Sequence, residues 1–459
     1  MVKNVPSRRL LWPVVIVLSV VCGALDVRGV SAHASVICAA LVLCFAYAVL
    51  RPNTPVLIGP PRSLPGRLRI GIGRLALLGL IAAIAGCAAA PERERPLPAA
   101  VASDAIIPDI PGARYWGDER PAGLAAWLTL PEEVLRAHYG GIMDRPHNYL
   151  VTSGGGGDGA FGAGLLVGWT EAGSRPEFQI VTGISTGALM APFAFLGSAY
   201  DPVLREIYTE FSTKDLVEMR GPLKIIRGDA VTSTRPLRRK IAQYLNDDVI
   251  AQIAAEGRKG RSLLVGTTNL DAGRPVIWDI THIAASGSPR AASLIHDVIL
   301  ASASIPGVFP PVLIEVEANG RRYDELHFDG GVTAQLFFSP VRTDWRRIAR
   351  RLRVQGEPRL YVIRNAKLHP GWRTVKPRLL PIMNRAIDTL IRTQGIGNLA
   401  ELYIIAREQG LDYRLADIPA SFYAVSNEPF DKTYMSALFE LGQRRAVAGE
   451  AWLRLDELD

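Results

Sequence analysis

The sequence predicts an α/β fold, in which strands alternate with helices and build a layered sheet. Short aliphatic runs such as residues 148–153 and 359–364 have the composition of buried strands. Segments with helical periodicity stand between these runs, which is the order expected of an α/β chain. The length of 459 residues is sufficient for such a fold with a large core.

The globular part is expected to run from residue 113 to residue 459. Predicted strands cover residues 148–153, 178–184, 261–268, 275–280, 322–328 and 359–364. Predicted helices cover residues 121–140, 160–172 and 186–199, and Pro131 opens a helix within the first of these stretches.

An arginine-rich stretch at residues 342–353 has the pattern of an amphipathic helix. Trp345, Ile348 and Leu352 fall on one helical face and arginines surround them. The pattern favours a surface helix that packs its apolar stripe on the sheet. Contact with anionic lipid headgroups is the alternative interpretation.

Residues 1–74 predict two hydrophobic membrane segments and a basic linker. Residues 10–25 are apolar but short for a span, whereas residues 30–50 lack a formal charge and are long enough to cross a bilayer. These 74 residues carry nine Lys or Arg and one acid, Asp26, which equals the whole chain's net charge of +8. The globular part is therefore balanced in charge, and the excess indicates membrane-flanking arginines rather than a nucleic-acid surface.

Residues 75–87 resemble an export signal that ends in a cysteine. The last four residues, Ile84-Ala85-Gly86-Cys87, are similar to a bacterial lipobox, which implies cleavage before Cys87 and a lipid anchor on its sulfur. A third membrane segment is the alternative. Residues 88–112 are predicted to be a tether. This arrangement implies a membrane-associated protein of the bacterial cell envelope, with the following domain on the periplasmic or extracytoplasmic side.

All four cysteines precede the globular part. Because they stand at positions 22, 38, 44 and 87, we expect neither a disulfide nor a thiolate metal site beyond residue 87.

A G-x-S-x-G motif at residues 183–187 follows the predicted strand at 178–184. A serine between a strand and a helix can stand exposed on a sharp turn, where the helix N-terminus points at its hydroxyl. Gly183 and Gly187 would remove side chains that collide where strand and helix cross. Ser185 is therefore a candidate nucleophile, although a plain turn or helix N-cap shares this pattern.

A run of glycines follows the strand at 148–153. Its backbone N–H groups can turn inward because no Cβ atoms interfere, so that the loop binds an anion at the start of the next helix. A Walker loop is unlikely because no Gly-Lys-Ser/Thr follows, and a dinucleotide fingerprint matches only weakly. An oxyanion hole is the best interpretation because the serine motif ends the next strand, which places both at one sheet edge. The residues concerned are Gly154, Gly155, Gly156, Gly157 and Gly159.

The candidate base is Asp329, at the end of the strand at 322–328 and before Gly330 and Gly331. None of the six histidines of the globular part stands in a recognisable motif. Asp-Gly-Gly can also be a simple turn, but together with the other two motifs it favours a catalytic carboxylate.

The three motifs in this order resemble the patatin-like phospholipase family. Further stretches similar to family segments are residues 268–273, 301–311 and 430–442, so that the resemblance covers residues 147–445. It implies the patatin-like three-layer fold, with a central, mostly parallel sheet flanked by helices, here preceded by the N-terminal membrane segments. It also implies a Ser–Asp dyad without a catalytic histidine.

By the resemblance, Ser185 is the nucleophile and Asp329 the base, and the loop glycines hold the oxyanion. Ile184 and Thr186 complete the elbow around the serine. One position departs from the family: Asp158 stands where its members usually carry Lys or Arg. A carboxylate facing the oxyanion would oppose the charge to be stabilised, so we expect Asp158 to point outward and to cap the helix that starts near residue 159.

The sequence thus predicts a carboxylic ester hydrolase that acts on membrane lipids, of the phospholipase A or lipid acyl hydrolase type. Membrane lipids are expected both as substrate and as attachment surface, with no cofactor, metal or nucleic acid, and no oligomeric state is predicted. Two alternatives stay open. One is an esterase or thioesterase for soluble acyl substrates, and the other is a lipid-binding protein whose dyad no longer works.

Overall fold

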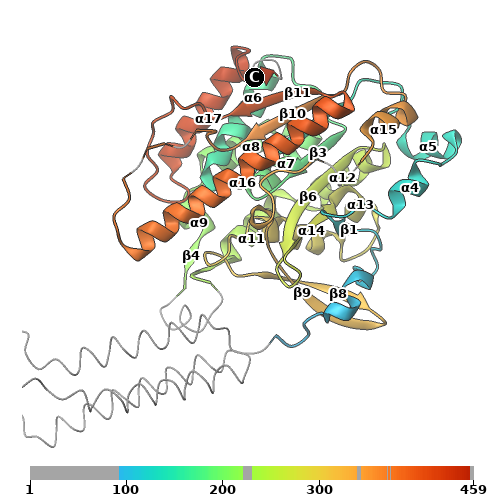
Figure 1. Ribbon diagram of the computed structural model, residues 1–459, viewed down its shortest axis with the longest axis horizontal. Helices are drawn as coiled ribbons and strands as arrows, with labels where there is room; N and C mark the ends of the chain where they lie inside the picture. The colour runs from blue at the N-terminus through green and yellow to red at the C-terminus, as the bar shows by residue number, and fades with distance from the viewer. Residues whose placement is uncertain (1–92, 221–229, 339–342, 370, 373, 455–459) are drawn as a thin grey trace, which may run out of the picture. The chain divides into compact units, whose positions relative to one another are not determined.

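The computed structural model describes residues 93–220, 230–338, 343–369, 371–372 and 374–454 (Figure 1). The predicted membrane segments at 10–25 and 30–50, the signal-like stretch at 75–87 and Cys87 all lie outside these residues. Among the helices of the described residues, none combines the length and apolarity that a bilayer crossing requires.

Ten strands of the described chain form one sheet. The strands of the structure are β1 Arg114–Trp116, β2 Asn148–Thr152, β3 Ile180–Gly183, β4 Glu218–Met219, β5 Thr232–Ser233, β6 Ser262–Asn269, β7 Arg274–Asp279, β8 Val312–Ala318, β9 Arg321–Asp329, β10 Arg359–Arg364, β11 Asp412–Asp417 and β12 Leu453–Arg454. The order along the large sheet is β1-β7-β6-β3-β2-β10-β11-β12, with β9 pairing to β6 and β8 to β9, while β4 and β5 pair separately.

The centre of the sheet is parallel and its margins are antiparallel. Strands β6, β3, β2, β10 and β11 pair in parallel. The pairs β6–β7, β7–β1, β6–β9, β9–β8 and β11–β12 are antiparallel. The predicted α/β fold with a mostly parallel central sheet is therefore confirmed for the five central strands.

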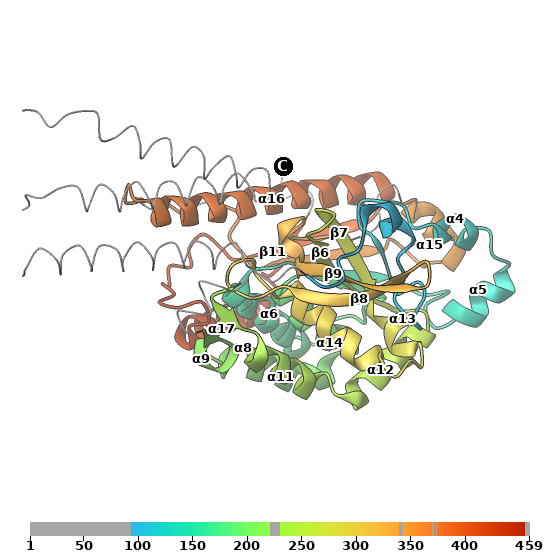
Figure 2. The same cartoon turned by 90° about the horizontal axis from the view of Figure 1, so that it is seen from below.

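Helices cover both faces of this sheet (Figure 2). The helices of the structure are α4 Gly123–Trp127, α5 Glu132–Tyr139, α6 Gly159–Glu171, α7 Thr186–Leu196, α8 Asp201–Thr209, α9 Thr213–Leu216, α11 Arg235–Tyr244, α12 Asp247–Arg258, α13 Ile280–Ala285, α14 Ala291–Ser302, α15 Trp345–Leu352, α16 Leu379–Gln409 and α17 Lys432–Val447. Short 3₁₀ turns are η2 Ala99–Asp104, η3 Gly156–Asp158, η4 Ser198–Tyr200 and η5 Gly330–Val332.

The two hydrophobic clusters of the core lie on opposite faces of the sheet. In β10, Tyr361 and Ile363 join the cluster that contains α6, α7, α14 and α17, whereas Leu360 and Val362 join the cluster that contains α5, α15 and α16. This alternation follows from the two-residue period of a strand. Because both faces are covered, the central strands are continuously apolar, which explains why they were predictable from the sequence.

The arginine-rich helix packs as predicted. Trp345, Ile348 and Leu352 of α15 are buried in the second cluster. Residues 121–140, in contrast, form two helices, because the chain is extended at Pro131, the N-cap of α5.

Residues 93–112, which the sequence predicts as part of a tether, pack against the domain instead. Ile107 and Ile110 are buried in the first cluster. Arg93 forms an ion pair with Asp271 at 2.7 Å. The burial of these apolar side chains means that the folded domain begins before residue 113.

Helices α6 and α17 cross at close distance. A Cβ atom on Gly164 of α6 would overlap the carbonyl oxygen of Phe439, and one on Gly442 of α17 would overlap the carbonyl oxygen of Phe161. Glycine on both helices therefore sets the distance between them, and this crossing lies directly behind the glycine loop that starts α6.

We expect Gly164→Ala to lower the free energy of unfolding by about 1–3 kcal/mol, because the added methyl group meets backbone that cannot move aside. Gly397→Ala is the matched control: this glycine also lies within a helix, α16, but its Cβ would meet open space. The control should stabilise by up to about 1 kcal/mol through helix propensity alone. Urea denaturation measures both, and equal effects of the two substitutions would contradict the close crossing.

Candidate active site

Ser185 lies on a strained turn between β3 and α7. Its backbone has φ 57° and ψ −124°, a conformation that residues with a side chain rarely adopt. A Cβ on Gly183 would lie 2.5 Å from the carbonyl oxygen of Gly187, and one on Gly187 would overlap that of Thr152. The two glycines therefore have the steric role that the sequence predicts for them.

The neighbours of Ser185 fix the turn from both sides. The side chain of Ile184 is buried against the backbone of Gly266 and Gly330. The hydroxyl of Thr186 lies 2.9 Å from that of Tyr208, which also donates to the Thr186 carbonyl at 2.9 Å. These contacts tie the elbow to β6 and α8.

Two serines at the end of α14 hold both candidate residues, a role that the sequence analysis missed. Ser185 donates its backbone N–H to the hydroxyl of Ser302 at 3.0 Å, and that hydroxyl donates to the carbonyl of Gly266 at 2.7 Å. Asp329 donates its N–H to the carbonyl of Ser304 at 3.0 Å. The signal was present, because both serines lie in the stretch 301–311 that resembles the family.

Asp329 ends β9, and its buried carboxylate reaches Ser185. The carboxylate accepts a hydrogen bond of 2.7 Å from the N–H of Gly331. Burial raises the pKa of Asp329 to about 6, while the Ser185 side chain and the N–H of Gly331 partly oppose that rise. At neutral pH this carboxylate is mostly ionised, but it is a stronger proton acceptor than an exposed aspartate.

The nearest histidine in sequence, His327, is engaged elsewhere. Its ring nitrogens contact the hydroxyl of Thr267 at 3.0 Å and the carboxylate of Glu325 at 3.1 Å. Burial lowers the pKa of His327. The structure thus brings Ser185 together with an aspartate and leaves this histidine in a separate buried network.

The glycine loop runs past Ser185. A Cβ on Gly154 would lie 3.2 Å from the Cβ of Ser185, and Gly156 lines the same pocket as the serine. Gly155 and Gly156 have φ values of 156° and 57°, which only glycine adopts without strain. Within the described chain, no hydrogen bond uses the N–H groups of Gly155, Gly156 or Gly157. These three donors are therefore free to bind an anion.

Side chains from distant segments brace this loop. Asn365, just after β10, donates to the hydroxyl and the carbonyl of Ser153 at 2.8 and 2.9 Å and accepts from Gly162 at 3.1 Å. Gln335 accepts the N–H of Gly154 on its carbonyl at 3.3 Å and donates its amide to the Gly331 carbonyl at 2.8 Å. Gln335 therefore links the loop to the turn that carries Asp329.

The carboxylate of Asp158 contacts α17 and does not cap α6. It accepts a hydrogen bond of 2.7 Å from the hydroxyl of Tyr434 on α17, and α6 has no side-chain cap. Burial raises the pKa of Asp158 to about 6, against the effects of Tyr434 and the nearby charge of Lys367. The predicted cap is wrong, because the carboxylate bonds Tyr434 and not a backbone N–H of α6. Asp158, the residue at which this loop departs from the family, therefore has its carboxylate hydrogen-bonded to a side chain of α17.

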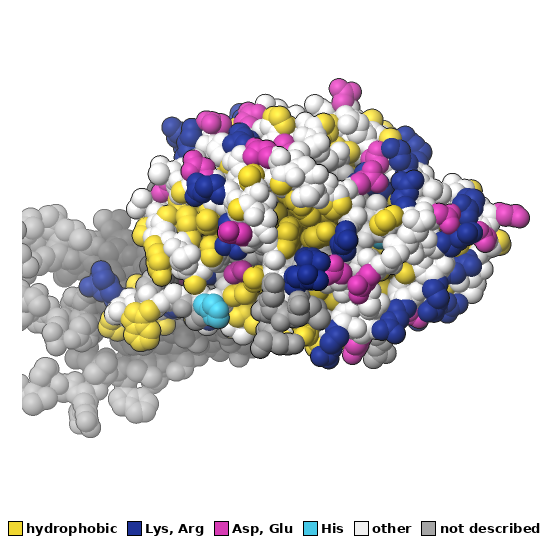
Figure 3. Space-filling view, turned by 90° about the horizontal axis from the view of Figure 1, so that it is seen from above, with side chains coloured by type: hydrophobic (Ala, Val, Ile, Leu, Met, Phe, Trp, Pro, Cys, Tyr) yellow, Lys and Arg dark blue, Asp and Glu magenta, His cyan; other side chains and the backbone are white. Residues whose placement is uncertain are grey.

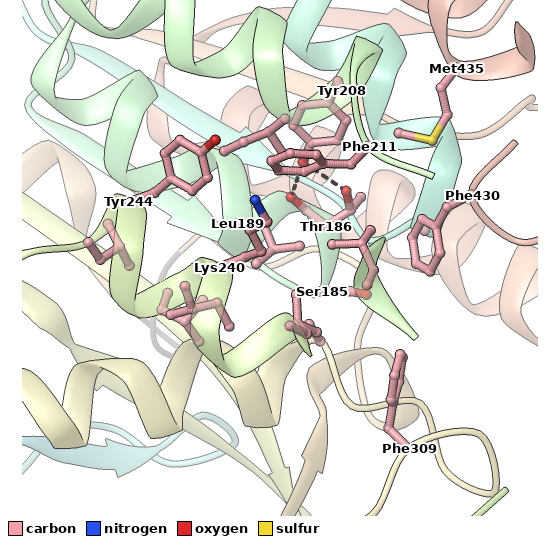
Figure 4. A pocket seen from close by; sticks show the side chains of 18 of the residues that line it. Ser185, Thr186, Leu189, Tyr208, Phe211, Lys240, Tyr244, Phe309, Phe430 and Met435 are labelled. Carbon is pink, nitrogen blue, oxygen red and sulfur yellow. Dashed lines mark hydrogen bonds between the residues drawn. The ribbon is translucent and has the colours of Figure 1, made fainter. Parts of the chain in front are cut away.

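An apolar pocket opens beside Ser185 (Figure 4). Its cavity has a volume of about 70 Å³. The walls come from α7, α8, α11, α14, α17 and the loops that adjoin them, and include Leu189, Phe211, Ile241, Phe309, Phe430 and Met435. Lys240 is the charged residue of this wall, and its Nζ lies 4.3 Å from the centre of the Phe211 ring. The apolar lining of this pocket suits an aliphatic group.

Comparison with known proteins identifies the domain. Residues 150–341, which include Ser185, Asp329 and the glycine loop, match the family model described as patatin-like phospholipase. The chain contains a patatin-like phospholipase domain. No curated protein matches the sequence.

Two solved structures are similar to the chain at low sequence identity. VipD from Legionella pneumophila is 12% identical, with a TM-score of 0.34, over 66% of this chain and 67% of that protein. Human GIVD cytosolic phospholipase A2 is 13% identical, with a TM-score of 0.28, over 70% of this chain and 53% of that protein. This chain therefore spans about half the length of the human enzyme.

In the described part of the chain, no group of three or more His, Cys, Asp or Glu residues is placed to hold a metal ion. The residues around Ser185 instead supply a hydroxyl, a carboxylate and unpaired backbone N–H groups.

We expect Ser302→Ala to leave the buried N–H of Ser185 without an acceptor, which costs about 1–3 kcal/mol of unfolding free energy and loosens the elbow. Turnover of an ester substrate should fall together with this loss. Ser293→Ala in the same helix, where the serine is exposed and bonds only within α14, is the matched control. Unchanged stability and turnover in Ser302→Ala would remove its assigned positioning role.

Proposed function

We propose that this protein is a serine acyl-ester hydrolase that acts on lipids through Ser185 and Asp329. The observation that carries the proposal is the placement of the buried Asp329 carboxylate next to Ser185, whose side chain lowers its pKa, at the wall of an apolar pocket. The match to the patatin-like phospholipase family supports the same reaction class.

The first step transfers the Ser185 proton to Asp329 while the serine oxygen attacks the ester carbonyl. As the tetrahedral intermediate collapses, the proton passes from Asp329 to the departing alcohol, and the acyl group stays on the serine. Water then gives a proton to Asp329 and attacks the acyl-enzyme, which releases the fatty acid and restores the hydroxyl. A base in direct contact with the serine makes an imidazole unnecessary for this sequence.

The developing negative charge requires donors that are already in place. The unpaired N–H groups of Gly155, Gly156 and Gly157 at the start of α6 are suited to that role. The hydrogen bond between Asp158 and Tyr434 keeps the nearby carboxylate engaged. This contact supports a working dyad over the alternative of an inactive one.

The apolar lining of the pocket favours an acyl chain over a polar group. Its walls are aliphatic and aromatic along most of their length, so burying methylene groups there contributes about 0.8 kcal/mol each. Membrane lipids meet this requirement.

The segments predicted at 30–50 and 75–87, with Cys87 as lipid anchor, support a location in the bacterial envelope with the domain on the extracytoplasmic side. Mass spectrometry of the mature N-terminus tests the anchor.

Replacing Ser185 by Ala should reduce hydrolysis of long-chain p-nitrophenyl esters and of phospholipid in mixed micelles to the uncatalysed background, since no acyl-enzyme can form. Ser421→Ala, which alters an exposed serine, should keep the wild-type rate. Colorimetric release and thin-layer analysis of fatty acid provide the measurement. Residual turnover in Ser185→Ala would exclude Ser185 as the nucleophile.

The rate of ester hydrolysis should rise with pH, with its midpoint near pH 6. The pKa of Asp329 is raised to about 6, and only the ionised carboxylate accepts the serine proton, so activity is lost as pH falls through this value. Asp329→Asn should lower kcat by about 10²–10⁴-fold at every pH.

Asp158 is the necessary control for this profile, because its pKa is also raised to about 6. Asp158→Asn should keep the same rising limb. A limb that disappears in Asp158→Asn, or a wild-type rate that stays constant between pH 5 and 8, would contradict the assignment of Asp329.

A further inference from the structure

The first half of α16 exposes an apolar stripe that the domain leaves uncovered. Ile382, Met383, Ile387, Leu390 and Ile391 all lie at the surface, and Leu390 is 69% exposed. Their spacing of about one helical turn places them along one side of the helix. The second half of the same helix buries Leu399 and Leu402 in the core, while Ile396 and Ile404 are exposed there. We call the five exposed residues the α16 stripe.

Two loops add exposed aromatic side chains beside the helix. Trp372 is 98% exposed, and its loop is held to α16 by a hydrogen bond of 3.1 Å from Arg385 to the carbonyl of Gly371. Tyr423 is 82% exposed in the loop after β11, and Lys367 bonds the carbonyl of Phe422 and lies 5.5 Å from the Tyr423 ring. Tryptophan and tyrosine are the side chains preferred at a membrane–water interface.

These elements gather at one end of the domain. Figures 1 and 2 both show α16 reaching this end with its first turns, and Figure 3 shows hydrophobic side chains collected there. An exposed apolar collection of this kind on a folded domain marks a contact surface.

The charge of the same segment selects a lipid surface as the occupant. Residues 367–392 carry six Lys or Arg and one acid, Asp388. A helix with an apolar side, flanked by cations and interfacial aromatics, lies in the headgroup region of an anionic bilayer. A second protein copy would bring the same positive charge to the contact and would therefore be repelled.

Both α16 and the loop that carries Tyr423 lead to the active site. Further along α16, Gln394 bonds the amide of Gln335 at 3.1 Å, next to the turn that carries Asp329. The loop of Tyr423 continues to Phe430, which lines the pocket beside Ser185. A bilayer held against this surface would therefore lie next to the elements that form the pocket.

We propose that the α16 stripe, together with Trp372 and Tyr423, docks the domain on an anionic bilayer so that lipid reaches the Ser185 pocket. This inference rests on the proposed lipid hydrolysis for its purpose, but the docking itself is measured separately from the reaction.

The experiment compares full-length wild type with Ile387→Glu/Leu390→Glu. Substrates are vesicles of phosphatidylcholine with and without 30 mol% phosphatidylglycerol (about that fraction gives a clearly negative surface) and a soluble short-chain ester. The double variant should hydrolyse anionic vesicles at least about ten-fold more slowly, because two apolar contacts are lost, and should keep the wild-type rate on the soluble ester. Val447→Glu on α17 is the matched control, since Val447 is an exposed helical apolar residue outside the surface.

Hydrogen exchange of the peptides covering residues 379–392 reads docking directly. Anionic vesicles should protect them in wild type and in Val447→Glu but not in the double variant. Absence of protection by vesicles, or an unchanged vesicle rate in the double variant, would overturn the proposal. Protection that grows with protein concentration in the absence of lipid would overturn it in favour of self-association. If wild type is protected but hydrolyses neither substrate, docking holds and the proposed reaction fails.

Discussion

The close approach of backbone around Ser185 is the constraint on which the rest of the site depends. The ends of β2 and β3, the start of α7 and the turn after β9 meet at distances that exclude side chains at Gly183, Gly187 and Gly330. The serine takes its strained conformation because these contacts, and the hydroxyl of Ser302 on its N–H, leave no alternative. A parallel arrangement of β2, β3 and β6 is required to bring these chain ends together at one edge.

The two aspartates near the site, Asp329 and Asp158, differ in the groups that surround them. Burial raises the pKa of Asp329 to about 6, against the effects of Ser185 and Gly331, which leaves the carboxylate ionised at neutral pH while still able to accept a proton. The pKa of Asp158 is also raised to about 6, and the hydrogen bond from Tyr434 directs this carboxylate toward α17. The two carboxylates therefore differ in what they face rather than in their affinity for protons, and only Asp329 faces the serine.

Sequence reasoning reached the parts of the fold that local chemistry determines. The strands that precede glycine turns, the elbow and the placement of Asp329 at a strand end were predictable because glycine and buried aliphatic runs have few alternative uses. Strand β8 and the edge strand β1 were not predicted, since their pairing depends on partners distant in sequence. Helix α16 was missed for a different reason: its first half is apolar toward solvent and its second half toward the core, so that no single periodic face marks it. Ser302, Gln335 and Asn365 were missed because their roles arise only when distant segments meet.

The central claim is that Ser185 is activated by Asp329, and reaction with a fluorophosphonate probe tests it most directly, since the probe requires an activated serine but no lipid. Peptide mapping of the labelled protein should find the adduct on Ser185, and the labelling rate should fall sharply in Asp329→Asn while its thermal unfolding stays that of a folded domain. An adduct on another residue, or a labelling rate that Asp329→Asn leaves unchanged, would contradict the account.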